Sequence, residues 1–414
     1  MQTPYFLIDK ERIDDNLKVL RRIADNTGCK ILLAQKCFSC YALYPLISNY
    51  LAGATASGLF EARLCHEEMQ GKENHIFSPA FREDQIDEIC RICDHIVFNS
   101  PSQLERFGNN AKSAGLQIGL RINPECSTQE GHAIYDPCAP GSRLGTRLND
   151  FEAAIQRNPS LLSLIDGLHF HTLCEQDSDD LQTTLNAVID KFGKYLSSMK
   201  WINFGGGHHI TREGYDIDLL ERCIIRMRDE YHLQVYLEPG EAVALNAGEL
   251  HSTILEIQPP DEQGISNVIL DTSAACHMPD VIEMPYTPPL QHAQEYNDND
   301  NETTLNPVGE PVEPQPSLRL AQDRRTLNPQ PYYRLGGPTC LSGDVIGLYQ
   351  FDHRLNEGEE LVFEDMAIYS MVKTNTFNGM PLPDIYIKEP TVNGQQPTVK
   401  LWKSFGYEDF KRRI

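Results

Sequence analysis

Several residue types in this sequence could together perform chemistry on an amine. Lys36 follows the apolar run 31–34 and Gln35. Burial in a dry pocket disfavours the charged ammonium, lowers the pKa of a lysine and makes it a nucleophile that forms Schiff bases. A lysine at a strand end more often extends its charge into solvent, so Lys36 needs suitable partners before this chemistry is assigned to it.

Three further groups are candidates for such partners. A glycine triplet at 205–207 would let backbone N–H groups approach a phosphate, although a tight turn explains it equally well. His171 could lie against a flat cofactor ring or be an ordinary core histidine. Glu238 could keep a basic ring nitrogen protonated or pair with a cation. With Lys36, these groups are the components of a pyridoxal phosphate site, whose cofactor accepts the electron pair left when a bond at an amino-acid α-carbon breaks.

These residues are far apart in sequence, so a fold must bring them together. Strand-like apolar runs alternate with amphipathic helix-like segments, and the runs are 30–35, 53–57, 74–78, 95–99, 117–123, 165–171, 201–205 and 234–239. The alternation predicts an α/β fold with a closed parallel (β/α)8 barrel, and an open doubly wound sheet is the alternative. No glycine-rich dinucleotide loop follows the first run, which disfavours the open sheet. In such barrels the chemistry lies where strands end, and the four groups follow strand ends.

The character of the sequence changes after the eighth run. Strand-like segments with short turns follow, and the opening segment TPYFLID is also strand-like. We expect the barrel to span residues 10–244 and a mostly antiparallel β domain to comprise residues 1–9 and 245–414. An insertion at about 295–331 is rich in Asn, Asp, Glu and Pro, and this composition predicts a mobile segment.

Composition limits the class of protein. The formal net charge of −23 over 414 residues argues against binding nucleic acid, which requires basic patches, and is compatible with steering a cationic small substrate. No apolar run is long enough for a membrane span, and the N-terminus lacks an apolar signal core. The twelve cysteines are scattered, which favours reduced thiols. These features predict a cytoplasmic protein.

Longer motifs resemble a known family. The stretches LLAQKCFS, ATASGLFEARL, LHFHTLCEQ, NFGGGHHI, LEPGEAV, DTSAACHMPDVIEMPY and LGGPTCLSGDVIG are similar to those of the barrel-type pyridoxal phosphate decarboxylases and alanine racemases. The EPGEA and HMPDVIEMPY stretches resemble the branch of that family that acts on carboxylated polyamines. The resemblance covers nearly the whole chain outside the insertion. It implies decarboxylation of carboxynorspermidine to norspermidine, and of carboxyspermidine to spermidine, in polyamine biosynthesis.

The resemblance also implies roles for individual residues. Lys36 would carry the cofactor as a Schiff base and His171 would stack on its ring. The phosphate would be held by Gly205, Gly206, Gly207, Gly240 and Tyr369. Cys340, in the GPTC motif, would enter the site from the second subunit of a homodimer with shared active sites and protonate the α-carbon. Asp344 would lie nearby at the dimer junction and contact the substrate.

One departure from the family bears on the substrate. Other decarboxylases of this fold usually have arginine after EPG, where it supports the phosphate, but here the residue is Glu241. A carboxylate at this position could bind an ammonium group of a small cationic carboxylated polyamine. Asp280 could bind a second ammonium, although loop solvation explains it as well, and Glu283 is a weaker candidate.

Three other functions remain open. A decarboxylase of the same fold could act on diaminopimelate, ornithine or arginine, although Glu241 argues against it. A non-catalytic pyridoxal phosphate carrier would need neither the β domain nor GPTC. A metal-dependent hydrolase could use His169 and His171, but in barrel hydrolases that pair usually lies on the first strand with an aspartate at the eighth. Lys36 and Glu238 occupy those places here, so no metal is expected.

Overall fold

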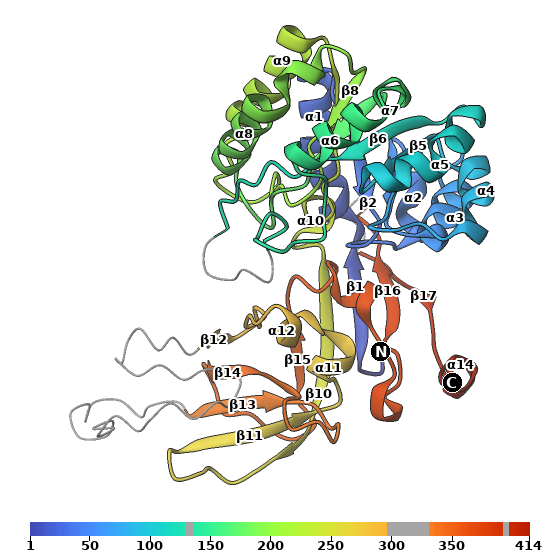
Figure 1. Cartoon of the computed structure of the whole chain (residues 1–414). Coiled ribbons are helices and arrows are strands. Elements are labelled where there is room, and N and C mark those ends of the chain that lie inside the picture. Colours follow the sequence, from blue (N-terminus) through green and yellow to red (C-terminus); the bar gives the residue numbers. More distant parts are fainter. Residues whose placement is uncertain (130–135, 296–330, 392–396) are drawn as a thin grey trace. The chain divides into compact units, whose positions relative to one another are not determined.

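The computed structural model of the chain describes residues 1–129, 136–295, 331–391 and 397–414 (Figure 1). It divides into two compact units, Lys10–Leu245 and the combination of Met1–Asp9 with Asn246–Ile414. The predicted insertion at about 295–331 lies almost entirely outside the described residues. No helix in the described part of the chain is long and apolar enough to cross a membrane.

The first unit is a closed barrel of parallel strands. Its strands are β2 (Lys30–Ala34), β3 (Gly53–Ala56), β4 (Glu73–Phe77), β5 (His95–Phe98), β6 (Gln117–Arg121), β7 (Gly167–His169), β8 (Trp201–Asn203) and β9 (Gln234–Leu237). The barrel closes where Lys30 of β2 lies beside Tyr236 of β9. Closure confirms the predicted (β/α)8 architecture and excludes the open sheet.

Helices connect the barrel strands. They are α1 (Lys10–Thr27), α2 (Tyr44–Ile47), α3 (Leu59–Glu68), α4 (Glu83–Ile92), α5 (Pro101–Ser113), α6 (Leu148–Arg157), α7 (Ser160–Leu164), α8 (Ser178–Leu196), α9 (Ile217–Tyr231) and the short α10 (Glu241–Ala244), with a 3-10 turn at Tyr41–Leu43. Helix α1 shows the pattern, because Ile13, Leu17 and Leu20 recur at helical spacing and are buried. Helix α8 begins with a capping box in which Asp177 and Asp180 satisfy backbone N–H groups.

The interior of the barrel is filled rather than hollow. Trp201 of β8 needs the space left by glycines on β7 and β6, since a Cβ atom at Gly167 would lie 2.1 Å from the indole and one at Gly119 2.5 Å from it. The indole packs with Leu32, Val97 and Tyr236 in a buried cluster. This packed interior holds the strand ends rigidly, and so positions the loops that follow them.

The second unit is built on a nine-stranded, mostly antiparallel sheet, as predicted. Its strand order is β12 (Ala293–Glu295), β14 (Val345–Phe351), β13 (Tyr332–Gly336), β11 (Ile265–Leu270), β10 (Gly248–Ile257), β1 (Tyr5–Asp9), β16 (Asp384–Lys388) and β17 (Val399–Lys403), and β15 (Glu360–Phe363) pairs with β10. Its helices are α11 (Ala274–His277), α12 (Asp280–Glu283), α13 (Ser370–Lys373) and α14 (Tyr407–Arg413), with a 3-10 turn at Phe377–Gly379. The N-terminal strand β1 joins this sheet, antiparallel to β10 and parallel to β16.

Candidate active site

The four predicted groups meet at the carboxyl end of the barrel. Lys36 follows β2, His171 follows β7, the glycine triplet follows β8 and Glu238 follows β9 directly. Burial lowers the pKa of His171, and the positive charge of Lys36 lowers it further. The imidazole is therefore neutral and faces the same space as the lysine.

The surroundings of Lys36 differ from a dry pocket. Its side chain is exposed in this chain, although its neighbours Gln35 and Cys37 are buried. The carboxyl group of Glu61 lies in reach of its charge, since burial raises the pKa of Glu61 and Lys36 partly opposes that rise. The side chain of Lys36 is thus exposed in the described chain, and the dry pocket expected around it stays a prediction.

The glycine loop has no room for side chains. Gly205 and Gly207 have φ angles of 72° and 82°, which L-residues with side chains rarely adopt. A Cβ atom at Gly206 would lie 2.6 Å from the Glu238 carbonyl oxygen, and one at Gly240 would lie 2.4 Å from the Cβ atom of Cys37. The loops after β8 and β9 thus present bare backbone beside the Lys36 loop, an arrangement suited to a bound phosphate.

Glu238 is a buried carboxylate with fixed partners. The side-chain amide of Asn203 donates a hydrogen bond of 2.7 Å to one oxygen, and Nε2 of His169 lies 3.3 Å from the other. Burial alone would raise the pKa of Glu238, but His169 and Asn203 outweigh it and lower the pKa to about 2. The group is therefore ionised at neutral pH, the state needed to keep a pyridine nitrogen protonated.

Two residues support His171: Arg121, to which sequence reasoning assigned no role, and Gly206 of the predicted phosphate loop. The carbonyl oxygen of His171 accepts a hydrogen bond of 3.2 Å from the buried guanidinium of Arg121, which also lies over the ring of Phe77 at 4.6 Å. The backbone N–H of Gly206 donates to Nδ1 of His171 at 3.2 Å. Arg121 ends β6, and its place at a strand end was the only sequence signal for this role.

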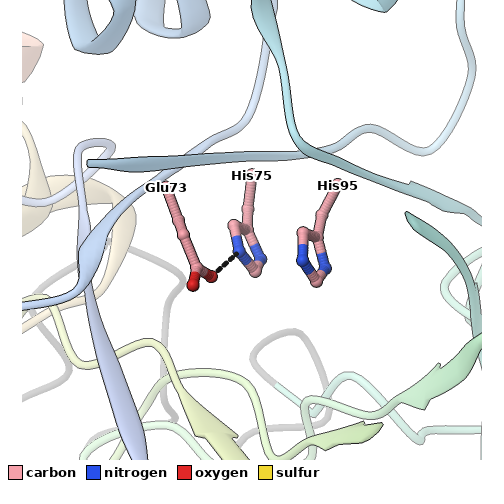
Figure 2. A group of neighbouring side chains, drawn as sticks. All are labelled: Glu73, His75 and His95. Carbon is pink, nitrogen blue, oxygen red and sulfur yellow. Dashed lines mark hydrogen bonds and ion pairs between the residues drawn. The ribbon is translucent and has the colours of Figure 1, made fainter. Parts of the chain in front are cut away.

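His169 and His171 have separate partners, which argues against the hydrolase hypothesis. Among the described residues, one group of side chains has ligand atoms close enough together to consider a metal: Glu73, His75 and His95, on strands β4 and β5 (Figure 2). The imidazole rings of His75 and His95 are stacked, with ring centroids 3.8 Å apart and an angle of 11° between the ring planes. Because these rings are stacked, their nitrogen lone pairs do not point toward a common metal position. The third member of the group, Glu73, pairs with Lys30. We interpret this group as a polar lining inside the barrel.

Two predicted substrate carboxylates already have a cation. Lys373 of α13 pairs with Asp280, and its Nζ atom lies 2.8 Å from a carboxylate oxygen of Glu283. Burial would lower the pKa of Lys373, but these carboxylates outweigh it and raise the pKa. A substrate ammonium would have to displace Lys373, so the arrangement favours an internal ion pair for Asp280 and Glu283 over substrate binding.

Asp344 makes hydrogen bonds that shape the loop carrying Cys340. Its buried carboxylate accepts hydrogen bonds from the hydroxyl of Ser273 at 2.9 Å, the hydroxyl of Thr339 at 2.6 Å and the backbone N–H of Ala275 at 3.2 Å. Cys340 itself is exposed. These contacts favour a structural role for Asp344, which shapes the GPTC loop, over contact with the substrate. Tyr369, the predicted phosphate ligand of this unit, precedes α13 with a φ angle of 52°.

We expect Asp344→Ala to lower the free energy of unfolding of the protein by about 2–4 kcal/mol, because it leaves the buried hydroxyl of Ser273 and the partly buried hydroxyl of Thr339 without their charged partner. Thermal or denaturant unfolding measures this loss. Glu262→Ala, which removes an exposed carboxylate from a turn of the same unit, is the matched control and should leave the transition unchanged. Equal stability of the two variants would contradict the structural role.

Comparisons with known proteins show the family of this chain. The family model described as "Pyridoxal-dependent decarboxylase, C-terminal sheet domain" matches residues 37–367. A carboxynorspermidine/carboxyspermidine decarboxylase of Campylobacter jejuni is 38% identical over 413 residues, covering 100% of this chain and 98% of that protein. A carboxyaminopropylagmatine decarboxylase of Synechocystis sp. is 37% identical over 415 residues, covering 100% of this chain and 96% of that protein.

A solved structure extends the likeness to three dimensions. The crystal structure of carboxynorspermidine decarboxylase from Campylobacter jejuni, complexed with norspermidine, has a TM-score of 0.83 to this chain at 37% identity, and the match covers 100% of both chains. One assignment accounts for the closed barrel, the lysine at its mouth, the glycine loop beside it and the full-length similarity. The chain belongs to the pyridoxal-dependent decarboxylases, enzymes whose cofactor is pyridoxal phosphate.

Proposed function

We propose that this enzyme decarboxylates carboxynorspermidine to norspermidine and carboxyspermidine to spermidine, as its relatives' names state for them. The observation that carries the proposal is the full-length similarity to such enzymes, at 38% identity. The acidic chain and the buried Glu241 beside Gly240 agree with a polycationic substrate.

The residues of the chain have distinct tasks in this reaction. Bound pyridoxal phosphate supplies an electron sink for the carbon–carbon bond that breaks when carbon dioxide leaves. Lys36 would hold the cofactor through a Schiff base that the substrate amine can replace, and the backbone of 205–207 with Gly240 would bind the phosphate. Glu238 keeps the proton on the ring nitrogen, and His171, neutral and held by Arg121, supports the ring face.

The remaining roles belong to the second unit and to the assembly. Cys340, exposed in the GPTC loop, donates the proton that replaces carbon dioxide on the α-carbon, and it does so across a homodimer. Tyr369 binds the phosphate. The cysteines of the described residues are thiols, which agrees with action in the reducing cytoplasm. Size-exclusion chromatography with light scattering tests the dimer, and a mass equal to one chain would refute it.

The decisive experiment is a comparison of substrates on purified holoenzyme. Carbon dioxide release from carboxynorspermidine and carboxyspermidine should exceed release from diaminopimelate, ornithine and arginine in kcat/KM. A preference for one of the amino acids would overturn the proposal.

A second candidate substrate follows from the Synechocystis relative, which is nearly as similar to this chain as the Campylobacter enzyme. Carboxyaminopropylagmatine carries a guanidinium group where carboxynorspermidine carries an ammonium, and a carboxylate binds either one. Measuring kcat/KM for both compounds on one preparation decides between them.

We expect Glu241→Gln to reduce kcat/KM for carboxynorspermidine by roughly tenfold to a hundredfold. The lost interaction is a charge-assisted hydrogen bond of about 1.5–3 kcal/mol, and about 1.4 kcal/mol corresponds to a factor of ten. Glutamate repels the phosphate, so affinity for pyridoxal phosphate should hold or improve. Steady-state kinetics and cofactor titration measure the two effects.

Glu213→Gln is the matched control, because Glu213 lies exposed in the loop between β8 and α9. It should change neither kcat/KM for carboxynorspermidine nor the affinity for pyridoxal phosphate. If Glu241→Gln instead weakens cofactor binding and keeps its efficiency at saturating cofactor, Glu241 serves the cofactor and its assignment to the substrate fails.

A further inference from the structure

Glu241, the proposed ammonium ligand, already faces a histidine. Nε2 of His209 lies 3.1 Å from Oε2 of Glu241, and both residues are buried. The hydroxyl of Thr211 donates a hydrogen bond of 2.9 Å to the carbonyl oxygen of Ala242, which holds the loop after β8 against α10. The pair is therefore a built feature of the barrel unit and not a chance contact of mobile side chains.

The side chains of His209 and Glu241 lie close together without being fixed by a hydrogen-bond network. Within the described part of the chain, neither ring nitrogen of His209 makes a well-aligned hydrogen bond, and Glu241, 3.1 Å from Nε2, is the carboxylate paired with it. The loop after β7 holds only the backbone of His209, whose N–H donates to the carbonyl oxygen of Gln176 at 3.3 Å. An imidazole held in this way can give up its carboxylate without breaking other side-chain bonds.

The surrounding charges favour a cation at this place. Glu175, from the loop after β7, adds a second negative charge near His209, and Arg212 adds a positive one. Arg212 also pairs with Asp177, so its charge is largely balanced. Burial would lower the pKa of His209, but Glu241 outweighs that effect and raises it. Because Arg212 and Asp177 cancel, the site carries one net negative charge with His209 protonated and two with His209 neutral.

We infer that His209 is the resident counter-ion of Glu241, and that a substrate ammonium takes its place with release of the histidine's proton. The inference rests on the proposed function and makes His209 a positioning residue for substrate selection. Two cations beside one buried carboxylate repel each other. The arriving ammonium therefore drives the imidazole to its neutral form. A substrate without a distal cation cannot make this exchange, and it meets a site whose carboxylate is already neutralised.

The test uses norspermidine as the probe of the holoenzyme in isothermal titration calorimetry. Between about pH 5.5 and 6.5 its amines stay protonated, since isolated alkylammonium pKa values lie near 10 and repulsion between the ammonium groups lowers only that of the central amine substantially. Two buffers with different ionisation enthalpies report the protons released on binding. We expect proton release that grows as the pH falls, and an affinity that weakens by up to about tenfold for each pH unit below the pKa of His209.

Variants separate the proposed role from a merely structural one. His209→Gln should bind norspermidine with an affinity that is flat over this range and with no proton release beyond background. His66→Gln, which removes an exposed histidine from α3, is the matched control and should keep the linkage of the wild type. Far-ultraviolet circular dichroism checks folding, and the two-buffer measurement on the wild type decides alone if His209→Gln does not fold.

The outcomes distinguish this inference from the proposed function. Wild-type binding without proton release, or full pH dependence in a folded His209→Gln, would overturn the role of His209 even if carboxynorspermidine is decarboxylated. A failure to decarboxylate any carboxylated polyamine would overturn the proposed function. A holoenzyme that decarboxylates carboxynorspermidine yet shows no binding of norspermidine at any pH would also refute the exchange.

Discussion

Lys36→Ala is expected to lose the visible absorbance of bound pyridoxal phosphate and to lower kcat by more than about a thousandfold, the scale on which loss of a covalent catalyst is felt. The reason is positional. Lys36 is the lysine at the carboxyl end of β2, beside the bare backbone of the glycine loop and close enough to His171 for its positive charge to lower the pKa of that imidazole. Borohydride treatment followed by peptide mass spectrometry identifies the residue that carries the cofactor in the wild type.

Lys30 provides a demanding control for this prediction. It begins the same strand, so it lies at the opposite end of β2 and pairs with Glu73. Lys30→Gln should retain both the absorbance and the borohydride-reducible linkage. A linkage that survives in Lys36→Ala, or vanishes in Lys30→Gln while the barrel stays folded, would show that the wrong end of the barrel has been assigned to the chemistry.

The position of these residues was predictable because it follows from strand order. Parallel barrel strands all end at one rim, so Lys36 and Glu238 had to meet if the eight apolar runs were strands. Seven of the eight strands are shorter than their apolar runs, as β7 shows: it covers Gly167–His169 within the run 165–171. His171 consequently lies in the loop beyond β7, which is where its ring meets Gly206.

What the sequence could not supply are the contacts between loops. The pairing of His209 with Glu241 and that of Lys373 with Asp280 join residues of different loops and short helices, and no periodicity reports such contacts. The family motif predicts a substrate contact for Asp344. Its hydrogen-bond partners, Ser273 and Thr339, favour instead a role in shaping the loop, and no sequence pattern reports them.

Mixing inactive Lys36→Ala and Cys340→Ala subunits is expected to restore activity. The proposal places the lysine of one subunit and the cysteine of its partner in the same site. Random exchange of equal amounts makes half of the dimers mixed, and each mixed dimer has one site with both residues intact and one with neither. About a quarter of all sites should therefore be whole, which is a large gain because each parent has none.

The cysteine is suited to this role by its location. Cys340 is the one exposed cysteine in the described chain, at the tip of a loop whose base is fixed by the buried Asp344. A fixed base and an exposed tip allow the thiol to reach a neighbouring subunit while staying at a defined position. Cys340→Ala alone should keep the absorbance of the bound cofactor, since Lys36 is intact, and should lose the step that protonates carbon.

The control mixes Lys36→Ala with the double variant Lys36→Ala/Cys340→Ala. No pairing of those subunits gives a whole site, so any recovery there would reflect contamination or refolding rather than complementation. Native mass spectrometry of isotopically labelled subunits verifies that exchange has occurred. If verified mixed dimers of the single variants show only the sum of the parental activities, both residues must act within one chain. The GPTC loop would then have to serve the barrel of its own subunit.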